Sequence, residues 1–463
     1  MDIISLEQQI KQKIVSPTEL VHFFLKEIEK KNGELNAFIT VCEKEALQSA
    51  EQATIDIMKG NIRGPLHGIP IAIKDMILTK NIRTTLGSKV YEHYIPNEDA
   101  TVVRKLKDAG AIIIGKTNTH EFAYGPVGDQ SYFGPAHNPY DTTKITGGSS
   151  AGSGAAVASN LCAAALGTDT GGSVRIPASA CGIVGMKPTY GRVSKHGAFP
   201  LSYTLDHVGP MTKTVRDNAV LLNILAGYDP LDDASVAFTE EDFTRCMGKS
   251  IRHKKIGVPS FYFKGIDEEV RQQVHHVIQL YEQLGAEVVP IELDFIDDII
   301  RMQSIIIQSE AYAIHEDNLK KYAEDIQREV RKRLEDSKQI KGYEYVLAKR
   351  NQKKWIETFN KVFQEVDVLL TPTLPIVPTD IFQREVMIQG KSQAVIPTLL
   401  RQTSPTNYLG NPSLSVPCGF SKDSLPIGFQ LIAEHGAETK LYQFAAMFEQ
   451  AFSISSHEQN SGT

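Results

Sequence analysis

The sequence predicts a large α/β protein in which short apolar strands alternate with amphipathic helices. A helix followed by a strand is expected over residues 100–114 and again over residues 150–166, and residues 254–290 follow the order strand, helix, strand. Such alternation is typical of βαβ units, whose strands join one sheet. The chain has 463 residues, of which 41% are apolar, so it can bury a large core as one domain or as two.

Charge and cysteine content argue against several classes of protein. The formal net charge of −6 at pH 7 disfavours a protein that bulk electrostatics hold on nucleic acid or on anionic lipid. The five cysteines are scattered and form no CxxC pair, which indicates neither a disulfide framework nor a zinc site. The N-terminus has no apolar signal core, and the run 155–167 is too short to cross a bilayer. We therefore expect a soluble cytoplasmic protein.

The N-terminal part predicts a capped helix. Ser16 is the expected N-cap, with Pro17 at the first helical position and Glu19 three residues after the cap. The face that is expected to meet the core consists of Leu20, Phe23, Phe24 and Ile28.

The apolar run from Gly68 to Ile77 predicts a buried strand that contains one lysine, Lys74. Ile71 and Ile73 leave little room beside it for a solvated ammonium group. Burial lowers the pKa of a lysine toward that of a neutral amine that can act as a base. An ion pair with a nearby carboxylate, or a side chain that reaches the surface, is the alternative.

Two glycine-serine clusters within 27 residues, Gly147 to Ser173, mark the candidate active site. Ser149 and Ser150 stand in the first cluster, and Ser173 closes the second. Glycines leave backbone N–H groups free to converge on the oxyanion that forms when an amide or ester carbonyl is attacked. Ser173 is the better candidate nucleophile. For the flanking residues Asp169 and Arg175, an ion pair that braces the loop is favoured over a catalytic role.

Two local patterns suggest other chemistries. Residues 110–117 have the spacing of a phosphate-binding loop, but a helix precedes them and three isoleucines fill the interior, where β-branched residues resist the required conformations. Lys116 and Thr117 are expected to end a strand instead. The GxSxG pattern at 148–152 would make Ser150 the nucleophile of an α/β-hydrolase, although no strand signal precedes it. Its base would come from His196, His207 or His435.

Metal chemistry has little support in the sequence. His120 and His315 each begin an HExxH-like pattern, but Tyr124 and Leu319 occupy the place of the second histidine. No metal and no cofactor are expected.

The C-terminal half is less informative. Residues 299–365 are charged and helical, and the single Trp355 within them is expected to be a packing residue. Strands are expected at 367–373 and 413–417.

Two long segments resemble the amidase signature family. They are GGSSAGSGAAVA from Gly147 and ALGTDTGGSVRIPASACGIVGMKPTYGRVS from Ala165, and GIPIAIKD around Lys74 is similar to the family's upstream lysine segment. The likeness runs from about Ser16 to LPIGFQLIA near the C-terminus. It implies an α/β amidase-signature fold, with a central mixed twisted β-sheet covered on both faces by α-helices. It also implies one domain over 1–463, with a signature core at about 66–212 and a helix-rich specificity region at about 294–400.

The resemblance implies roles for the residues that match. Ser173 would be the nucleophile, Ser149 the bridging serine in a cis peptide bond, and Lys74 the base. The oxyanion hole would consist of the backbone N–H groups of Thr170, Gly171, Gly172 and Ser173. Ser150 would support the site by hydrogen bonding, and the loops 371–378 and 401–410 would line the acyl pocket.

Two activities within the family remain open. One is a stand-alone amidase that hydrolyses a small-molecule amide through an acyl-enzyme. The other is the A subunit of the tRNA-dependent amidotransferase, which releases ammonia from glutamine for a partner subunit. Residues 197–210 resemble the stand-alone amidases, and QIKGYEYVLA at 339–348 replaces an amidotransferase-like LSSGYYDAYY segment. The sequence therefore favours the amidase, without direct contact to nucleic acid; a homodimer is compatible with it, and a catalytically silent scaffold is the alternative from another class.

Overall fold

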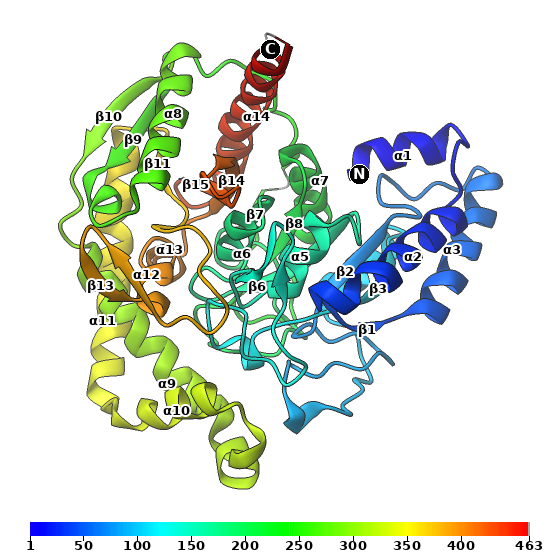
Figure 1. Cartoon of the computed structure of the whole chain (residues 1–463), viewed down its shortest axis with the longest axis horizontal. Helices are drawn as coiled ribbons and strands as arrows, with labels where there is room; N and C mark the ends of the chain where they lie inside the picture. The colour runs from blue at the N-terminus through cyan, green and yellow to red at the C-terminus, as the bar shows by residue number, and fades with distance from the viewer. Residues whose placement is uncertain (240, 462–463) are drawn as a thin grey trace.

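The computed structural model describes residues 1–239 and 241–461, and side chains as far as residue 453. Within these residues, eleven strands form one sheet in the order β1-β3-β2-β6-β8-β7-β14-β15-β11-β9-β10 (Figure 1). The strands of this sheet are β1 Phe38–Val41, β2 Pro70–Lys74, β3 Ile112–Thr117, β6 Ala164–Asp169, β7 Val184–Lys187, β8 His207–Thr212, β9 Lys255–Pro259, β10 Glu287–Ile291, β11 Val368–Pro372, β14 Ser413–Phe420 and β15 Pro426–Ile432. Two small sheets pair β4 His137–Asn138 with β5 Asp141–Ile145, and β12 Glu385–Ile388 with β13 Lys391–Ala394.

Helices cover both faces of the large sheet (Figure 1). The α-helices of the described residues are α1 Ile3–Lys11, α2 Pro17–Leu35, α3 Glu43–Met58, α4 Thr101–Asp108, α5 Ala151–Ala158, α6 Arg175–Ala180, α7 Val215–Leu225, α8 Glu268–Gln283, α9 Ile296–Tyr322, α10 Arg328–Asp336, α11 Gly342–Asn360, α12 Val395–Leu400, α13 Ser404–Leu409 and α14 Glu438–Ser461. Of these, α9, α10 and α11 lie together at the lower left of the view. The predicted α/β class and the mixed central sheet are confirmed.

The sheet brings two predicted site segments to one edge. Strand β2 is parallel to β3 and to β6, and Ile73 pairs with Leu166. Because parallel strands end at the same edge of a sheet, Lys74 at the end of β2 lies beside the last residues of β6. The glycine-serine loop that contains Ser173 begins directly after β6, so the topology places it next to Lys74.

A helix of small residues, α5, packs against the strands that carry this edge. Helix α5 starts directly after Ser150, and a Cβ on its Gly152 would lie only 2.2 Å from the backbone oxygen of Ala37 and 2.4 Å from the nitrogen of Asn118. Only glycine permits this approach, because every other residue would bring its Cβ into the backbone of its neighbours. The small-residue run therefore allows α5 to pack tightly beside β3.

The predicted N-terminal helix is α2, and its capping is as expected. Ser16 Oγ accepts a hydrogen bond from the N–H of Glu19 at 3.2 Å, and the Glu19 carboxylate accepts one from the N–H of Ser16 at 2.9 Å. Phe23 was wrongly placed in the core face, because 39% of it is exposed. Leu20, Phe24 and Ile28 recur every four residues and form the buried stripe, from which Phe23 is rotated by roughly 100°.

Other elements agree with the sequence except at their ends. The expected βαβ unit is β9, α8 and β10, with β9 and β10 parallel. Strand β3 ends with Lys116 and Thr117, as expected, whereas β6 continues to Asp169, three residues beyond the predicted end. The segment before Gly148, for which the sequence predicts no strand, contains the hairpin β4–β5, in which two threonines and an isoleucine favour the extended backbone.

Candidate active site

Lys74 is fully buried at the end of β2. Its Nζ lies 2.7 Å from Ser149 Oγ and 2.7 Å from Thr168 Oγ1. Burial lowers the pKa of Lys74 to about 7, although the negative charges of Asp169 and Asp206 oppose the shift. Within the described part of the chain no carboxylate forms an ion pair with Lys74. The amine can therefore lose its proton near neutral pH, which a general base requires.

Ser149 is held by the segment that follows β3. The peptide bond between Gly148 and Ser149 is cis. The carbonyl oxygen of Ser149 accepts hydrogen bonds from the N–H of His120 at 3.1 Å and from Thr119 Oγ1 at 3.0 Å. These contacts fix the backbone of Ser149, whose hydroxyl faces Lys74.

The loop that contains Ser173 is braced by Asp169. The Asp169 carboxylate accepts hydrogen bonds from the N–H of Gly172 at 2.8 Å and of Val174 at 3.1 Å, and it pairs with Arg175 at 3.0 Å. Burial raises the pKa of Asp169, but Arg175 and Asn407 more than offset it and keep this pKa well below its usual range. The favoured interpretation of this pair as a structural ion pair agrees with these contacts.

The same contacts reduce the number of N–H groups that can form the expected oxyanion hole. The N–H of Gly172 already donates to Asp169, so it is not free for a substrate oxyanion, contrary to the expectation from the sequence. The N–H groups of Thr170, Gly171 and Ser173 donate no hydrogen bond to any described residue. Three of the four expected donors are therefore available.

Ser173 lies beside the first serine cluster. Its carbonyl oxygen accepts a hydrogen bond from the N–H of Ser150 at 3.3 Å, and 6% of the residue is exposed. Within the described residues, no hydrogen bond joins the hydroxyl oxygens of Ser149 and Ser173. The structure therefore shows the hydrogen bond between Lys74 and Ser149, but none between Ser149 and Ser173. A serine hydroxyl rotates about χ1, and catalytic hydrogen bonds commonly shorten only when substrate is bound.

Two residues of the site are not singled out by the sequence. Thr168 provides the second contact to Lys74, and Asp206 accepts a hydrogen bond from Thr170 Oγ1 at 2.6 Å. Burial raises the pKa of Asp206 to about 6. Threonine in a strand and aspartate before a strand are common, so neither residue carries a local signal of its role.

The two predicted pocket loops behave differently. In 401–410, Thr403 and Asn407 donate hydrogen bonds to the carbonyl oxygens of Gly171 and Asp169, so this segment reaches the Ser173 loop. In 371–378, Thr373 bonds to the sheet, with its N–H on the carbonyl oxygen of Gly428.

The structure places the alternative nucleophile Ser150 in a structural role. Its hydroxyl donates to the carbonyl oxygen of Thr168 at 3.2 Å and accepts from the N–H of Thr168 at 3.3 Å. Among the described residues no histidine bonds to Ser150. His207 instead contacts Lys187 and the carbonyl oxygen of Leu205, and His435 contacts that of Leu409.

The other two patterns also have structural explanations. Residues 112–117 of the phosphate-loop pattern form the buried strand β3. His315 stacks on Phe122 with ring centroids 4.1 Å apart, and both ring nitrogens of His120 are buried without a hydrogen-bond partner. No group of three candidate ligands that could hold a metal ion occurs in the part of the chain that is described.

Trp355 stacks on Phe295, in keeping with a packing role.

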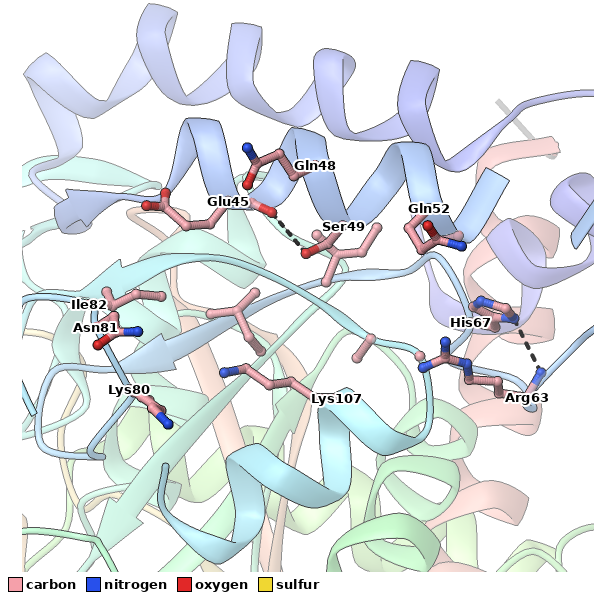
Figure 2. Close-up of a pocket in the computed structure, with 15 residues that line it drawn as sticks. Glu45, Gln48, Ser49, Gln52, Arg63, His67, Lys80, Asn81, Ile82 and Lys107 are labelled. Atoms are coloured by element: carbon pink, nitrogen blue, oxygen red, sulfur yellow. Dashed lines mark hydrogen bonds between the residues drawn. The ribbon is translucent and has the colours of Figure 1, made fainter. Parts of the chain in front are cut away.

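A cavity of about 510 Å³ lies away from these residues (Figure 2). It is bounded by Gln48 and Gln52 of α3 on one side and by Lys107 of α4 on the other, with Arg63 and His67 at one end. None of Lys74, Ser149 and Ser173 lines it. This cavity and the lysine-serine site are therefore separate features of this fold.

The fold and the buried lysine-serine site together point to a hydrolytic enzyme of the α/β class. The sequence model of the amidase family matches residues 19–442. The chain belongs to the amidase family, as the resemblance indicated, and it is a hydrolase that acts on C–N amide bonds.

Relatives of known name extend the comparison. The chain is 40% identical to the A subunit of glutamyl-tRNA(Gln) amidotransferase from Geobacter sp. (strain M21), over 97% of this chain and 96% of that protein. A solved structure described as a vestigial protein complex that reveals the origins of an s-triazine catabolic enzyme has a TM-score of 0.93 and 30% identity, and covers 97% of this chain and 98% of its own. The A subunit of glutamyl-tRNA(Gln) amidotransferase from Thermotoga maritima has a TM-score of 0.79 and 35% identity, with 94% and 91% covered. The sequence favours a stand-alone amidase, but these names agree better with the alternative, the A subunit of an amidotransferase.

None of the described helices is both long and apolar enough to cross a membrane. All five cysteines are free thiols.

Proposed function

We propose that the protein hydrolyses a primary carboxamide to the carboxylic acid and ammonia, with Ser173 as nucleophile and Lys74 as base. The observation that supports this most is the buried Lys74 amine, 2.7 Å from Ser149 Oγ, with a pKa lowered to about 7 and no carboxylate in an ion pair with it among the described residues. A lysine that served only structure would keep such a partner.

These residues suggest the following order of proton transfers and bond changes. Neutral Lys74 takes the proton of Ser149, which takes the proton of Ser173 as Ser173 Oγ forms a bond to the amide carbon. The N–H groups of Thr170, Gly171 and Ser173 would stabilise the oxyanion. The proton then passes from Lys74 through Ser149 to the nitrogen, and the C–N bond breaks to release ammonia. A water molecule then attacks the acyl carbon and passes a proton through Ser149 to Lys74. The ester bond to Ser173 Oγ breaks, the acid is released, and the proton returns through Ser149 to Ser173.

The relatives favour glutamine as the amide. Identity of 40% to the A subunit of an amidotransferase, over nearly the whole of both chains, supports a protein that passes ammonia to a partner. A stand-alone amidase is the second candidate. It is favoured by the local sequences at 197–210 and 339–348.

Ammonia release separates these candidates. Purified protein is incubated with glutamine, acetamide and benzamide, alone and together with the other subunits of a glutamyl-tRNA(Gln) amidotransferase. We expect release from glutamine that rises when those subunits are present, and no release by Ser173→Ala. Hydrolysis of acetamide or benzamide alone, with no response to added subunits, would establish the stand-alone amidase. Full activity of Ser173→Ala would contradict the assignment of Ser173 as the nucleophile in either candidate.

We further propose that residues 1–463 act as one amidase domain, because the large sheet takes strands from residue 38 to residue 432. A cytoplasmic location and a homodimer are proposals from the sequence alone.

A further inference from the structure

Four successive carbonyl groups before Ser173 each accept a hydrogen bond from outside the oxyanion loop, residues 169–173. Three of the donors are side chains far away in the sequence, and one is the backbone of α6. The pairs are Asn407 Nδ2 to the oxygen of Asp169 at 2.9 Å, Gln303 Nε2 to that of Thr170 at 3.2 Å, Thr403 Oγ1 to that of Gly171 at 2.7 Å, and the N–H of Ile176 to that of Gly172 at 2.7 Å.

These carbonyl contacts decide where the N–H groups of the loop point. A trans peptide unit is planar, so its N–H points opposite to its C=O. A donor that holds the carbonyl of Thr170 therefore also fixes the direction of the Gly171 N–H. Such a constraint matters most at glycine, whose backbone otherwise rotates widely, and the loop has two glycines in succession.

Gln303 differs from the other side-chain donors in what it controls. Thr403 binds the carbonyl oxygen of Gly171, and the N–H of that peptide unit, which belongs to Gly172, already donates to Asp169. Asn407 also bonds to the Asp169 carboxylate and to Arg175, so it belongs to the ion-pair network. Gln303 alone of the three holds a free N–H, that of Gly171, without a bond to that network.

The surroundings of Gln303 agree with a fixed contact. The side chain comes from α9 and is 5% exposed. A Cβ added at Gly171 would lie 3.4 Å from Gln303 Nε2, so the amide packs directly against the loop.

We propose that Gln303 is a positioning residue for the oxyanion: by donating to the carbonyl of Thr170, it directs the Gly171 N–H toward the carbonyl oxygen of the substrate. This inference rests on the proposed function. It connects the helix-rich region to the reaction, because the helix that supplies Gln303 lies outside the signature core.

The test compares Gln303→Leu with Gln308→Leu on the same helix. Among the described residues, Gln308 Nε2 bonds only to Ser304 of its own helix, so Gln308→Leu is a matched control. The probes are 4-nitrophenyl acetate, an activated ester, and phenylboronic acid, which forms a tetrahedral adduct with a serine nucleophile. Removal of one oxyanion donor lowers kcat by about 10²- to 10³-fold. When the donor is kept but its direction is no longer fixed, kcat should fall by about 10- to 100-fold.

We expect Gln303→Leu to lower kcat by about 10- to 100-fold, with KM changed by no more than about twofold. It should raise the Kd of phenylboronic acid by the same factor, because kcat and this Kd both report on the tetrahedral state. Gln308→Leu should change neither. An unchanged boronate Kd in a folded Gln303→Leu protein would overturn the inference, as would equal effects in the two variants. If Gln303→Leu fails to fold, Gln303→Glu, which keeps the size but cannot donate when ionised, takes its place.

Ser173→Ala separates this inference from the proposed function. If Ser173→Ala still turns over the ester at the wild-type rate, the proposed function fails. If Ser173→Ala is inactive while Gln303→Leu is unimpaired, only the role of Gln303 fails.

Discussion

Lys74 and Lys116 occupy neighbouring parallel strands, and both are fully buried, yet their surroundings differ. Lys116 Nζ donates to the carbonyl oxygen of Ile77 and to Thr84 Oγ1, each at 2.7 Å, and lies 3.6 Å from the Asp75 carboxylate. Lys74 has two hydroxyl partners, on Ser149 and Thr168, and no carboxylate in contact among the described residues.

This difference in partners separates a structural lysine from a candidate base. Burial lowers the pKa of Lys116 to about 8, with Asp75 opposing the shift, and that of Lys74 to about 7. Burial also raises the pKa of Asp75, and the charge of Lys116 opposes that shift, so each of the two groups favours the charged form of the other. Lys74 is divided between its two protonation states, as a proton carrier must be.

Replacing each lysine by methionine should separate activity from stability. Lys74→Met should lower kcat/KM by about 10³-fold, because the base is lost. Lys116→Met should leave Asp75 buried and uncompensated and lower the free energy of unfolding by about 3 to 5 kcal/mol, with kcat per folded molecule nearly unchanged. Steady-state kinetics and urea unfolding measure the two effects. The reverse pattern, an inactive Lys116→Met and an active Lys74→Met, would show that the two roles are interchanged.

The pH dependence of the reaction should follow Lys74 and not Lys116. The base must be neutral, so kcat/KM should fall about tenfold for each pH unit below about 7 and level off above it. A pH profile between 5 and 9 checks the prediction, and Lys116→Met should reproduce it. A profile that stays flat through pH 7 would exclude Lys74 as the titrating base.

The two threonines next to the lysines offer a smaller, matched comparison. Thr168→Val removes one partner of Lys74 and should lower kcat by roughly tenfold, since a general base contributes about 10² to 10⁴ only when it is held in place. Thr84→Val removes the equivalent partner of Lys116 and should cost about 1 to 2 kcal/mol of unfolding free energy, without an effect on kcat. Kinetics and thermal unfolding of both variants suffice. Equal kinetic losses would mean that Lys116 also serves the reaction.

Local sequence was enough wherever one short segment carried the information. The Ser16 cap predicts α2 because the cap and its partner Glu19 are three residues apart. The isoleucines around Lys74 predict its burial, since they lie in the same strand. Phe23 shows the limit of such patterns: it is apolar and next to Phe24, but only the packing of α2 determines which of the two faces the core.

What the sequence determined by itself was the family, the α/β class and the three residues proposed for the reaction, because long contiguous motifs carry them. The tertiary structure alone decided which N–H groups of the loop are free and which side chains hold its carbonyls. Gln303, Thr403 and Asn407 lie 133, 232 and 238 residues from the loop positions that they contact, and chain separation of that size leaves no local pattern. Backbone direction at glycine depends on contacts across the whole fold, and the neighbouring sequence does not contain them.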